Sequence, residues 1–319
     1  MRPGLGTPKG VQPRVSAGVQ PRVKRVQPRV SAGVQPRLLL FALAIATAHA
    51  SLAAQSAPPS GRAQAPRDIT GYWVSVVSED WHWRMVTPRK GDFTSLPLNA
   101  EGRRVASAWD PMKEKPAEAC RPFGAAAIMR VPGRVHLTWA DDATLRIDTD
   151  AGQQTRRLQF GKLASRGWRV NGRGEIEWFA EGRDAPPPAG PATWQGYSAA
   201  RWELAPDPAA VRNAVFFAGG LGTGPNGAGT MTPGTFGSLH VITTQLKAGY
   251  LRANGVPYSD AARVTEDYDF RTEDDGTEWF TVTTTVEDPK YLSAPFVTST
   301  DFRKEADGSK WRPTSCAAY

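Results

Sequence analysis

Apolar and polar residues alternate with a period of two over most of the chain. In the clearest stretch, Val135, Leu137 and Trp139 alternate with polar residues. Such alternation turns the apolar side chains to one face and is typical of a half-buried β-strand. Turn-forming sequences at 141–143 and 150–152 divide this region into a three-strand meander. Further strands are predicted at 72–78, 81–87, 175–179, 193–204, 238–246, 263–270, 278–287 and 296–304.

Helical periodicity is confined to one place. Asn99 is a good N-cap for a short helix near residues 100–110, and Pro111 ends that helix. Many strands with one helical excursion indicate an antiparallel sheet rather than a parallel α/β fold. We therefore predict a mainly β protein, an antiparallel barrel or sandwich of lipocalin-like or larger size, with one short helix near 100–110.

The N-terminal region has a different pattern. Residues 38–50 read LLLFALAIATAHA and follow Arg37, which matches the basic n-region, short apolar core and small-residue cleavage site of a signal peptide. We predict the apolar core and cleavage site over 38–54, and hence a periplasmic or secreted protein. The run is too short to span a bilayer, so no transmembrane segment is expected after cleavage. A buried core helix is the alternative interpretation.

Composition suggests the domain organisation. Residues 1–37 repeat Val-Gln-Pro-Arg without an apolar face, which predicts a low-complexity extension. Residues 55–67 are rich in Ala, Pro, Ser and Gln and predict a linker. Residues 68–319 are expected to form a single β-rich domain, or two packed β units with a boundary near the Gly/Pro-rich loop 205–237.

The net positive charge of the chain lies in its N-terminal leader. The chain carries 39 Lys and Arg against 31 Asp and Glu. Eight of the cations and none of the acids lie in residues 1–50, so the remainder is neutral. A basic protein suggests a nucleic-acid or anionic-membrane partner. Because the excess leaves with the leader, no nucleic-acid partner is expected.

The chain has two cysteines, Cys120 and Cys316. In an oxidising compartment an even count indicates a disulfide between them, and two separate free thiols are the alternative. His82, His136 and His240 lie in separate predicted strands without the close spacing of a metal motif, so no metal is expected. A three-histidine zinc site built by tertiary proximity is the alternative.

One stretch imitates a cofactor motif. Residues 222–227, GTGPNG, match the dinucleotide fingerprint letter for letter. That fingerprint requires a following helix whose N-terminus faces the pyrophosphate, and Gly229, Pro233 and Gly234 prevent one. The stretch is interpreted as a loop, and no cofactor is predicted.

The densest group of candidate ligand contacts lies in the sequence EDWHWRM. If this stretch is extended, Trp81 and Trp83 share one face, and Asp80, His82 and Arg84 share the other. An aromatic wall beside an acid, a base and a cation suits a polar aromatic ligand. An ordinary barrel strand with one packed and one wet face explains the same alternation.

Other candidate ligand contacts combine aromatic rings and charges at strand positions. They are Arg201, Glu203, Tyr250, Arg252, Tyr258 and Glu266. Tyr258 and Glu266, together with Ser259, surround a proline turn and are candidates for the mouth of a cavity. For each of them, pairing across a sheet or a surface position is the alternative.

Two resemblances bear on the fold. Gly71-Tyr72-Trp73 opens the first predicted strand, and Gly-x-Trp at this place resembles the lipocalin-like barrels. This resemblance implies a tryptophan that closes one barrel end under an arginine, here Arg303 or Arg312. The chain also resembles a large group of exported bacterial proteins of unknown function, which implies export and a β-rich fold but no activity. The motifs that carry this second resemblance are LNAEGR at 98–103, WDP at 109–111, CRPFG at 120–124, Ile128-Met129, GYSAARWE at 196–203, VPYSD at 256–260, Glu266, and VEDP at 286–289.

These observations favour a non-enzymatic binder of a small apolar or aromatic ligand in a β-lined cavity. A hydrolase or lyase that uses carboxylates with His82 is the first alternative, and it requires two or more of Asp80, His82, Glu203 and Glu266 within hydrogen-bond reach. A structural or interaction module of the envelope is the second alternative. Such a module is expected to have a filled interior and an exposed apolar patch.

Overall fold

The computed structural model describes residues 61–171, 173, 175–206 and 233–316. All of them belong to one compact unit that spans 58–319. The predicted extension 1–37, the signal peptide 38–54, the first part of the linker 55–67 and the fingerprint-like stretch 222–227 lie outside the described residues.

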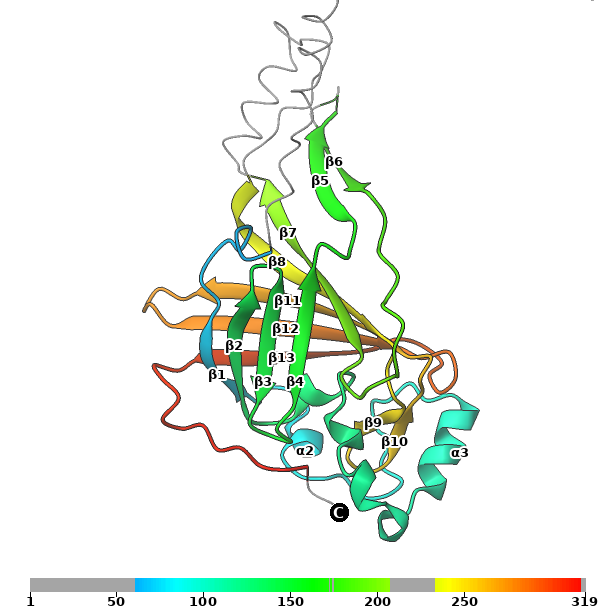
Figure 1. Cartoon of the computed structure of the whole chain (residues 1–319). Coiled ribbons are helices and arrows are strands. Elements are labelled where there is room, and N and C mark those ends of the chain that lie inside the picture. The colour runs from blue at the N-terminus through cyan, green and yellow to red at the C-terminus, as the bar shows by residue number, and fades with distance from the viewer. Residues whose placement is uncertain (1–60, 172, 174, 207–232, 317–319) are drawn as a thin grey trace, which may run out of the picture. The chain divides into compact units, whose positions relative to one another are not determined.

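Nine strands close into a barrel, which confirms the mainly β prediction (Figure 1). Around the barrel their order is β1-β13-β12-β11-β8-β7-β4-β3-β2. Their bounds are β1 Gly71–Val76, β2 Arg134–Asp141, β3 Thr144–Thr149, β4 Thr155–Phe160, β7 Tyr197–Pro206, β8 Pro233–Thr244, β11 Arg263–Thr272, β12 Glu278–Glu287 and β13 Phe296–Lys304. Closure leaves no open strand edge in the barrel, because β1 pairs with β13 on one side and with β2 on the other.

One pair in the barrel is parallel. β4 runs beside β7 in the register Leu158↔Ser198, while the other neighbours are antiparallel. Between them the chain forms the hairpin β5 (Ser165–Val170) and β6 (Ile176–Glu181), and then returns along the barrel to start β7 at its other end (Figure 1). A parallel pair needs such a long crossover. β7 and β8, which flank the Gly/Pro-rich loop, pair with each other in the same barrel.

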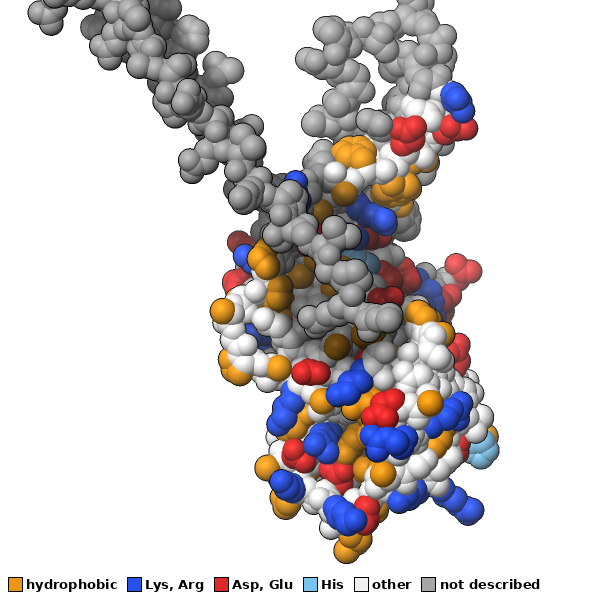
Figure 2. Space-filling view, turned by 90° about the vertical axis from the view of Figure 1, so that its right-hand side faces the viewer, with side chains coloured by type: hydrophobic (Ala, Val, Ile, Leu, Met, Phe, Trp, Pro, Cys, Tyr) orange, Lys and Arg blue, Asp and Glu red, His pale blue; other side chains and the backbone are white. Residues whose placement is uncertain are grey.

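Short helices and a small hairpin gather at one end of the barrel. The hairpin consists of β9 (Gly249–Arg252) and β10 (Val256–Tyr258). The helices are α2 Trp81–Arg84, α3 Ala100–Ala108, and the 3-10 turns η1 Pro111–Lys113, η2 Pro116–Glu118, η3 Arg121–Phe123 and η4 Ile128–Arg130. In Figure 2, the surface at this end mixes basic, acidic and apolar side chains, with no large area of one charge.

The predicted helix near 100–110 is confirmed as α3. The side chain of Asn99 accepts a hydrogen bond from the Gly102 amide at 2.8 Å and caps it, as the sequence indicates. A second cluster of buried apolar residues lies beneath α3 and the β9–β10 hairpin, and includes Leu98, Val256 and Phe296. This cluster fixes the loops at that end against the barrel.

The strand predicted at 81–87 is wrong, because the segment begins with the helical turn α2. Asp80 takes a left-handed conformation with φ 54°, and its carbonyl accepts hydrogen bonds from the amides of Trp83 and Arg84. β1, which precedes this segment, already has a strand on each side, so a further strand cannot join the sheet there. The alternation of aromatic residues in this segment therefore does not reflect a pleated strand.

The barrel interior is filled with side chains. Apolar residues at alternate positions of the barrel strands form one buried cluster, in which the rings of Phe280 and Phe302 stack at 4.6 Å. Trp73 belongs to this cluster, and the cation over its ring is Lys304 of β13, at 5.3 Å from the ring centroid. Arg303, one of the two arginines implied by the lipocalin-like resemblance, lies over Trp279 instead.

An ion pair is enclosed within this apolar interior. Arg156 of β4 and Glu266 of β11 are fully buried and joined by two hydrogen bonds of 2.8 and 2.5 Å. Burial alone lowers the pKa of Arg156, but the charge and hydrogen bonds of Glu266 raise it above its usual value. Tyr268 and Thr243 accept further hydrogen bonds from the guanidinium. Arg156 therefore stays charged inside the barrel.

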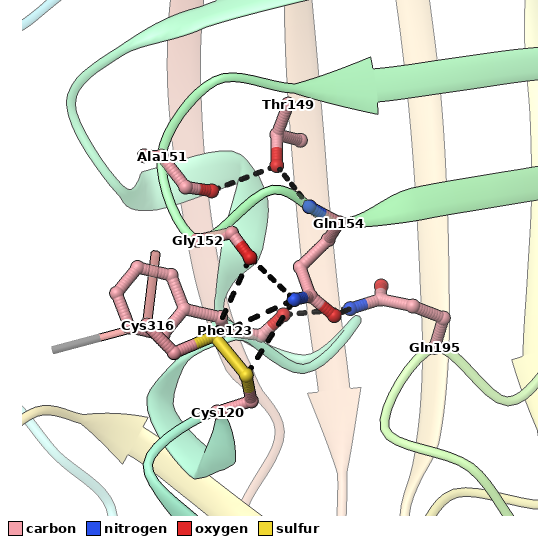
Figure 3. The surroundings of a disulfide bond; sticks show 8 residues. All are labelled: Cys120, Phe123, Thr149, Ala151, Gly152, Gln154, Gln195 and Cys316. Atoms are coloured by element: carbon pink, nitrogen blue, oxygen red, sulfur yellow. Dashed lines mark hydrogen bonds between the residues drawn. A yellow bond between two sulfur atoms is a disulfide. The ribbon is translucent and has the colours of Figure 1, made fainter. Parts of the chain in front are cut away.

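The predicted disulfide joins Cys120 to Cys316 (Figure 3). It ties the residue before η3 to the segment that follows β13. The amide of Gln154 points at both sulfurs and donates to the carbonyl of Gly152 at 2.6 Å. Gln195 donates to the Gln154 side chain, so the disulfide contacts a small network of hydrogen-bonded amides.

Loss of the disulfide is expected to lower stability strongly. Replacing Cys120 and Cys316 together with serine removes a bond between residues 196 positions apart, which by chain entropy stabilises the fold by about 5 kcal/mol. Urea unfolding followed by tryptophan fluorescence measures the loss. A reducing agent should destabilise the wild type and leave the double variant unchanged, and equal midpoints for oxidised and reduced wild type would contradict the prediction.

Breaking the buried ion pair from one side is expected to be more harmful than removing it. Arg156→Met leaves the carboxyl of Glu266 without its partner in an apolar interior, and should lower the free energy of unfolding by about 3–5 kcal/mol. The double variant Arg156→Met/Glu266→Leu should recover most of this loss in the same urea titration. If the double variant is no more stable than the single one, the barrel needs the polar contacts of both residues.

Candidate functional site

Three arginines from separate parts of the chain meet beside α2. Arg84 ends α2, Arg130 ends η4, and Arg252 ends β9. Arg130 and Arg252 are only 6% and 4% exposed, and Arg84 is half-buried. Arg84 Nε donates to the carbonyl of Arg130 at 2.9 Å, which joins two of the three segments. These residues are called the arginine cluster below.

One carboxylate pairs directly with this cluster. Asp80 Oδ2 accepts from Arg130 Nη2 at 2.9 Å, and this is the only salt bridge of the three arginines among the described residues. The left-handed backbone of Asp80 turns its side chain from the end of β1 toward η4. Asparagine and aspartate tolerate this conformation better than most residues.

Arg130 repels each of the other two arginines of the cluster. Burial lowers the pKa of Arg84 to about 10, and the positive charge of Arg130 lowers it as well. The same two causes, in the same order, lower the pKa of Arg252 to about 10. Asp80 and Asp92 act in the opposite direction on Arg252 without restoring its usual value. The cluster therefore has an excess of buried positive charge.

Several donors of the cluster have no acceptor. Arg252 Nη1 donates to the carbonyl of Thr94 at 2.8 Å, but its Nε and Nη2 are buried without a hydrogen-bond partner in the part of the chain that the structure describes. Arg84 Nη2 is buried and unpaired in the same way. A buried donor without a partner typically lowers stability by about 1–3 kcal/mol, so such groups require an explanation.

Aromatic rings accompany the charges. The guanidinium of Arg252 lies over the Trp83 ring, 4.9 Å from its centroid. The Trp83 indole donates to Asp92 Oδ2 at 3.0 Å, which holds the ring in place. Arg130 lies over the ring of Phe296, at 5.2 Å. Each arginine–ring contact stabilises the cation where few carboxylates are available.

A surface hollow of about 830 Å³ borders the cluster. It is lined by 91 and 93–97, by 295–297 and by Arg103. Phe296 and Thr94, two of its lining residues, are the partners of Arg130 and Arg252 described above. The hollow therefore adjoins the arginine cluster through these two residues, and none of the three arginines is among its lining residues.

Of the candidate ligand contacts predicted at 81–84, some lie in the arginine cluster and others are exposed to solvent. Trp83 and Arg84 join the cluster, and Arg252, distant in sequence, meets them there. Trp81 is 60% exposed and stacks on the exposed ring of His82 at 4.2 Å. The expected row of Asp80, His82 and Arg84 is not formed, because residues two positions apart do not share a face in a helical turn.

Arg201 and Glu203 belong to a different cluster, on the outer face of the barrel. Arg201 Nη2 donates to Glu203 Oε1 at 2.6 Å, and Arg166 of β5 donates to the same carboxylate at 3.2 Å. His240 Nδ1 lies 2.7 Å from Asp267 Oδ1 and 3.9 Å from Glu203. These residues line a second hollow, of about 580 Å³.

The remaining predicted contacts are buried in the fold. Tyr250 donates to Glu114 and accepts from Arg121, and burial followed by the bond to Glu114 raises the pKa of Tyr250 to about 12. Tyr258 is fully buried with an unpaired hydroxyl, and burial raises its pKa. Glu266 belongs to the ion pair inside the barrel.

Arg130 is the member of the site that sequence reasoning missed. Arg130 directly follows the apolar run Ala125–Met129 in the sequence. It is buried with that run, whereas arginines are mostly exposed in proteins.

The histidines do not form a metal site with one another. His82 lies on α2, His136 on β2 and His240 on β8. Within the described residues there is no group of three or more His, Cys, Asp or Glu side chains that could hold a metal ion. In the same part of the chain, no helix has the length and apolar character needed to cross a bilayer.

Comparison of the chain with family models, curated proteins and solved structures found no match. The function of the chain is therefore inferred from the geometry of the site alone.

The charge of Asp80 is expected to hold the cluster together. Asp80→Asn keeps the size and the backbone tolerance of the residue but leaves Arg130 without its carboxylate, so the free energy of unfolding should fall by about 1–3 kcal/mol in urea titrations. Asp275→Asn, at an exposed turn acid, is the matched control and should change it by less than about 0.5 kcal/mol. Equal losses in the two variants would contradict a role for this pair.

Proposed function

We propose that this protein is exported and binds a small apolar or aromatic ligand without transforming it. The ligand is held in the hollow lined by 93–97 and 295–297. The observation that carries the proposal is the size and lining of this hollow. A volume of about 830 Å³ lies in the range of small-molecule sites, and half-buried Phe93 with exposed Pro295 and Val297 supplies apolar surface in a lining that also has polar groups.

The hollow accommodates a ligand better than the barrel interior does. Trp73, Phe280 and Phe302 occupy the interior together with the buried ion pair, so a ligand there would have to displace packed side chains. At the hollow, the first residues of β13 form one wall and Val297 is 57% exposed. Burial of such an exposed apolar side chain under a ligand contributes to binding.

Export is supported by two independent features. The leader 38–54 has the composition of a signal peptide. The disulfide between Cys120 and Cys316 is typical of proteins that mature in the periplasm or outside the cell.

The binding function is preferred to a hydrolase or lyase for a geometrical reason. Asp80 pairs with Arg130, His82 is exposed on α2, Glu203 lies on the outer face of the barrel, and Glu266 is sealed inside it. The acid, base and stabilising groups of such a mechanism have to converge on one substrate, and these four do not.

The hollow is tested with a neutral aromatic probe. Isothermal titration calorimetry with 1-naphthalenemethanol should detect binding to the disulfide-bonded protein, and Val297→Glu should weaken it at least tenfold because a carboxylate is placed on an apolar wall. Ile176→Glu, which changes a 43% exposed apolar residue of β6, is the matched control and should bind as the wild type does. Absence of binding, or equal losses in both variants, would reject the hollow as the ligand seat.

A further inference from the structure

The unpaired nitrogens of Arg252 lie on one edge of its guanidinium. Nη1 is engaged with the Thr94 carbonyl, whereas Nε and Nη2 have no acceptor among the described residues. The Nε–Nη2 edge presents two parallel N–H groups, which match the two oxygens of a carboxylate or a phosphate. A single water can accept only part of this pair and brings no charge. The free edge therefore has the geometry of a bidentate oxyanion receptor.

The surroundings of this edge add to its preference for an anion. Arg252 is 4% exposed, so a charge held there is poorly screened by solvent. Arg130 is close enough to lower the pKa of Arg252, and Arg84 carries a third buried donor, Nη2, that lacks an acceptor. Asp80 is already bonded to Arg130 and is not free to pair with the others. A bound anion would offset the repulsion that Arg130 exerts on Arg252 and on Arg84.

The cluster and the hollow are linked through common residues. Thr94 binds Arg252 through its carbonyl, Phe296 lies under Arg130, and both residues line the hollow. The side chains of Trp83 and Arg252 stack, which keeps the guanidinium in a fixed orientation. A ligand with an apolar body in the hollow and an anionic group at one end has to pass these shared residues to reach the buried edge of Arg252.

We propose that the arginine cluster is an oxyanion-binding subsite, in which Arg252 Nε and Nη2 hold two oxygens and Arg84 Nη2 a third, so that the ligand of the hollow is an apolar or aromatic acid. The apolar half of this inference depends on the proposed function, and the anionic half does not. A carboxylate, a phosphate and a sulfate share the required chemistry, and the probes below distinguish them.

The experiment compares two probes with the same ring system. 1-Naphthoate carries a carboxylate and 1-naphthalenemethanol carries a neutral hydroxymethyl group in its place. Calorimetry on the disulfide-bonded protein, at constant ionic strength in chloride, should give at least tenfold tighter binding for 1-naphthoate. Arg252→Gln and Arg84→Gln should each reduce this preference to less than threefold, and should leave the affinity for 1-naphthalenemethanol within twofold of the wild type.

Controls separate recognition from folding and general charge. Arg104→Gln removes an exposed arginine of α3 that pairs with Glu101, and should keep the full preference for 1-naphthoate. Circular dichroism and the melting temperature in chloride report whether each variant folds. If Arg252→Gln does not fold, Arg84→Gln, at a half-buried position, carries the test alone.

Inorganic phosphate and sulfate test the anionic half without the hollow. Either ion at 10 mM should raise the melting temperature of the wild type by several degrees above a chloride control of equal ionic strength, and should raise that of Arg84→Gln by less than half as much. A response to 1-naphthoate with none to phosphate or sulfate identifies a carboxylate ligand, and the reverse identifies a phosphate or sulfate ester.

The outcomes distinguish the two proposals. Equal affinities for 1-naphthoate and 1-naphthalenemethanol, with no thermal response to phosphate or sulfate, would overturn the oxyanion subsite and leave the hollow as a neutral site. A thermal response to an anion that Arg84→Gln and Arg252→Gln abolish, without binding of 1-naphthalenemethanol, would retain the subsite and reject the apolar seat. Preferences that persist in both variants would place the anion elsewhere and overturn the inference.

Discussion

Closure of the sheet is the constraint on which the rest of the structure depends. Because β1 is paired on both sides, the backbone groups of the barrel strands satisfy one another and the interior has a limited width. Alternate side chains such as Trp73 and Phe280 fill that width. Charged side chains therefore lie mainly on the outer face and in the loops at the ends of the barrel. The exception is the buried pair of Arg156 and Glu266, which bind each other.

The loop-rich end of the barrel is held in place by covalent and apolar contacts. The bond between Cys120 and Cys316 fixes the start of η3, and the apolar cluster beneath α3 fixes the β9–β10 hairpin. Arg252 belongs to this hairpin, Arg130 follows Ile128 and Met129 of η4, which are part of the barrel core, and Arg84 belongs to a short exposed turn. Two of the three cations are thus preorganised, which reduces the entropy lost when a ligand binds to them.

Much of the fold could be predicted from the sequence because it depends on local patterns. Alternation revealed most barrel strands, and Asn99 with its following residues revealed α3. The stretch at 81–87 has the alternation of a strand but begins with a helical turn, because its aromatic residues make different contacts. Trp83 faces Arg252, whereas Trp81 faces solvent. The sequence also does not show that β4 and β7 are parallel, since this depends on the length of the intervening crossover.

The candidate site was predicted only in part. Trp83, Arg84 and Arg252 were recognised as separate candidates, but their meeting depends on tertiary contacts between segments more than 150 residues apart, such as the Arg252–Thr94 hydrogen bond. Arg130 was overlooked because a single arginine has no periodicity to reveal it. Glu266 was expected at a cavity mouth, yet its carboxylate lies in the barrel because β11 alternation turns Val264, Glu266 and Tyr268 inward.

The pairing of β1 with β13 also constrains how the polypeptide can reach its native state. Trp73 lies opposite Lys304, so the sheet cannot close until residues far along the chain have been synthesised. Contacts of such high sequence separation slow folding, because a large loop must be ordered before they form. Until then the edge of β1 that pairs with β13 is open to other chains.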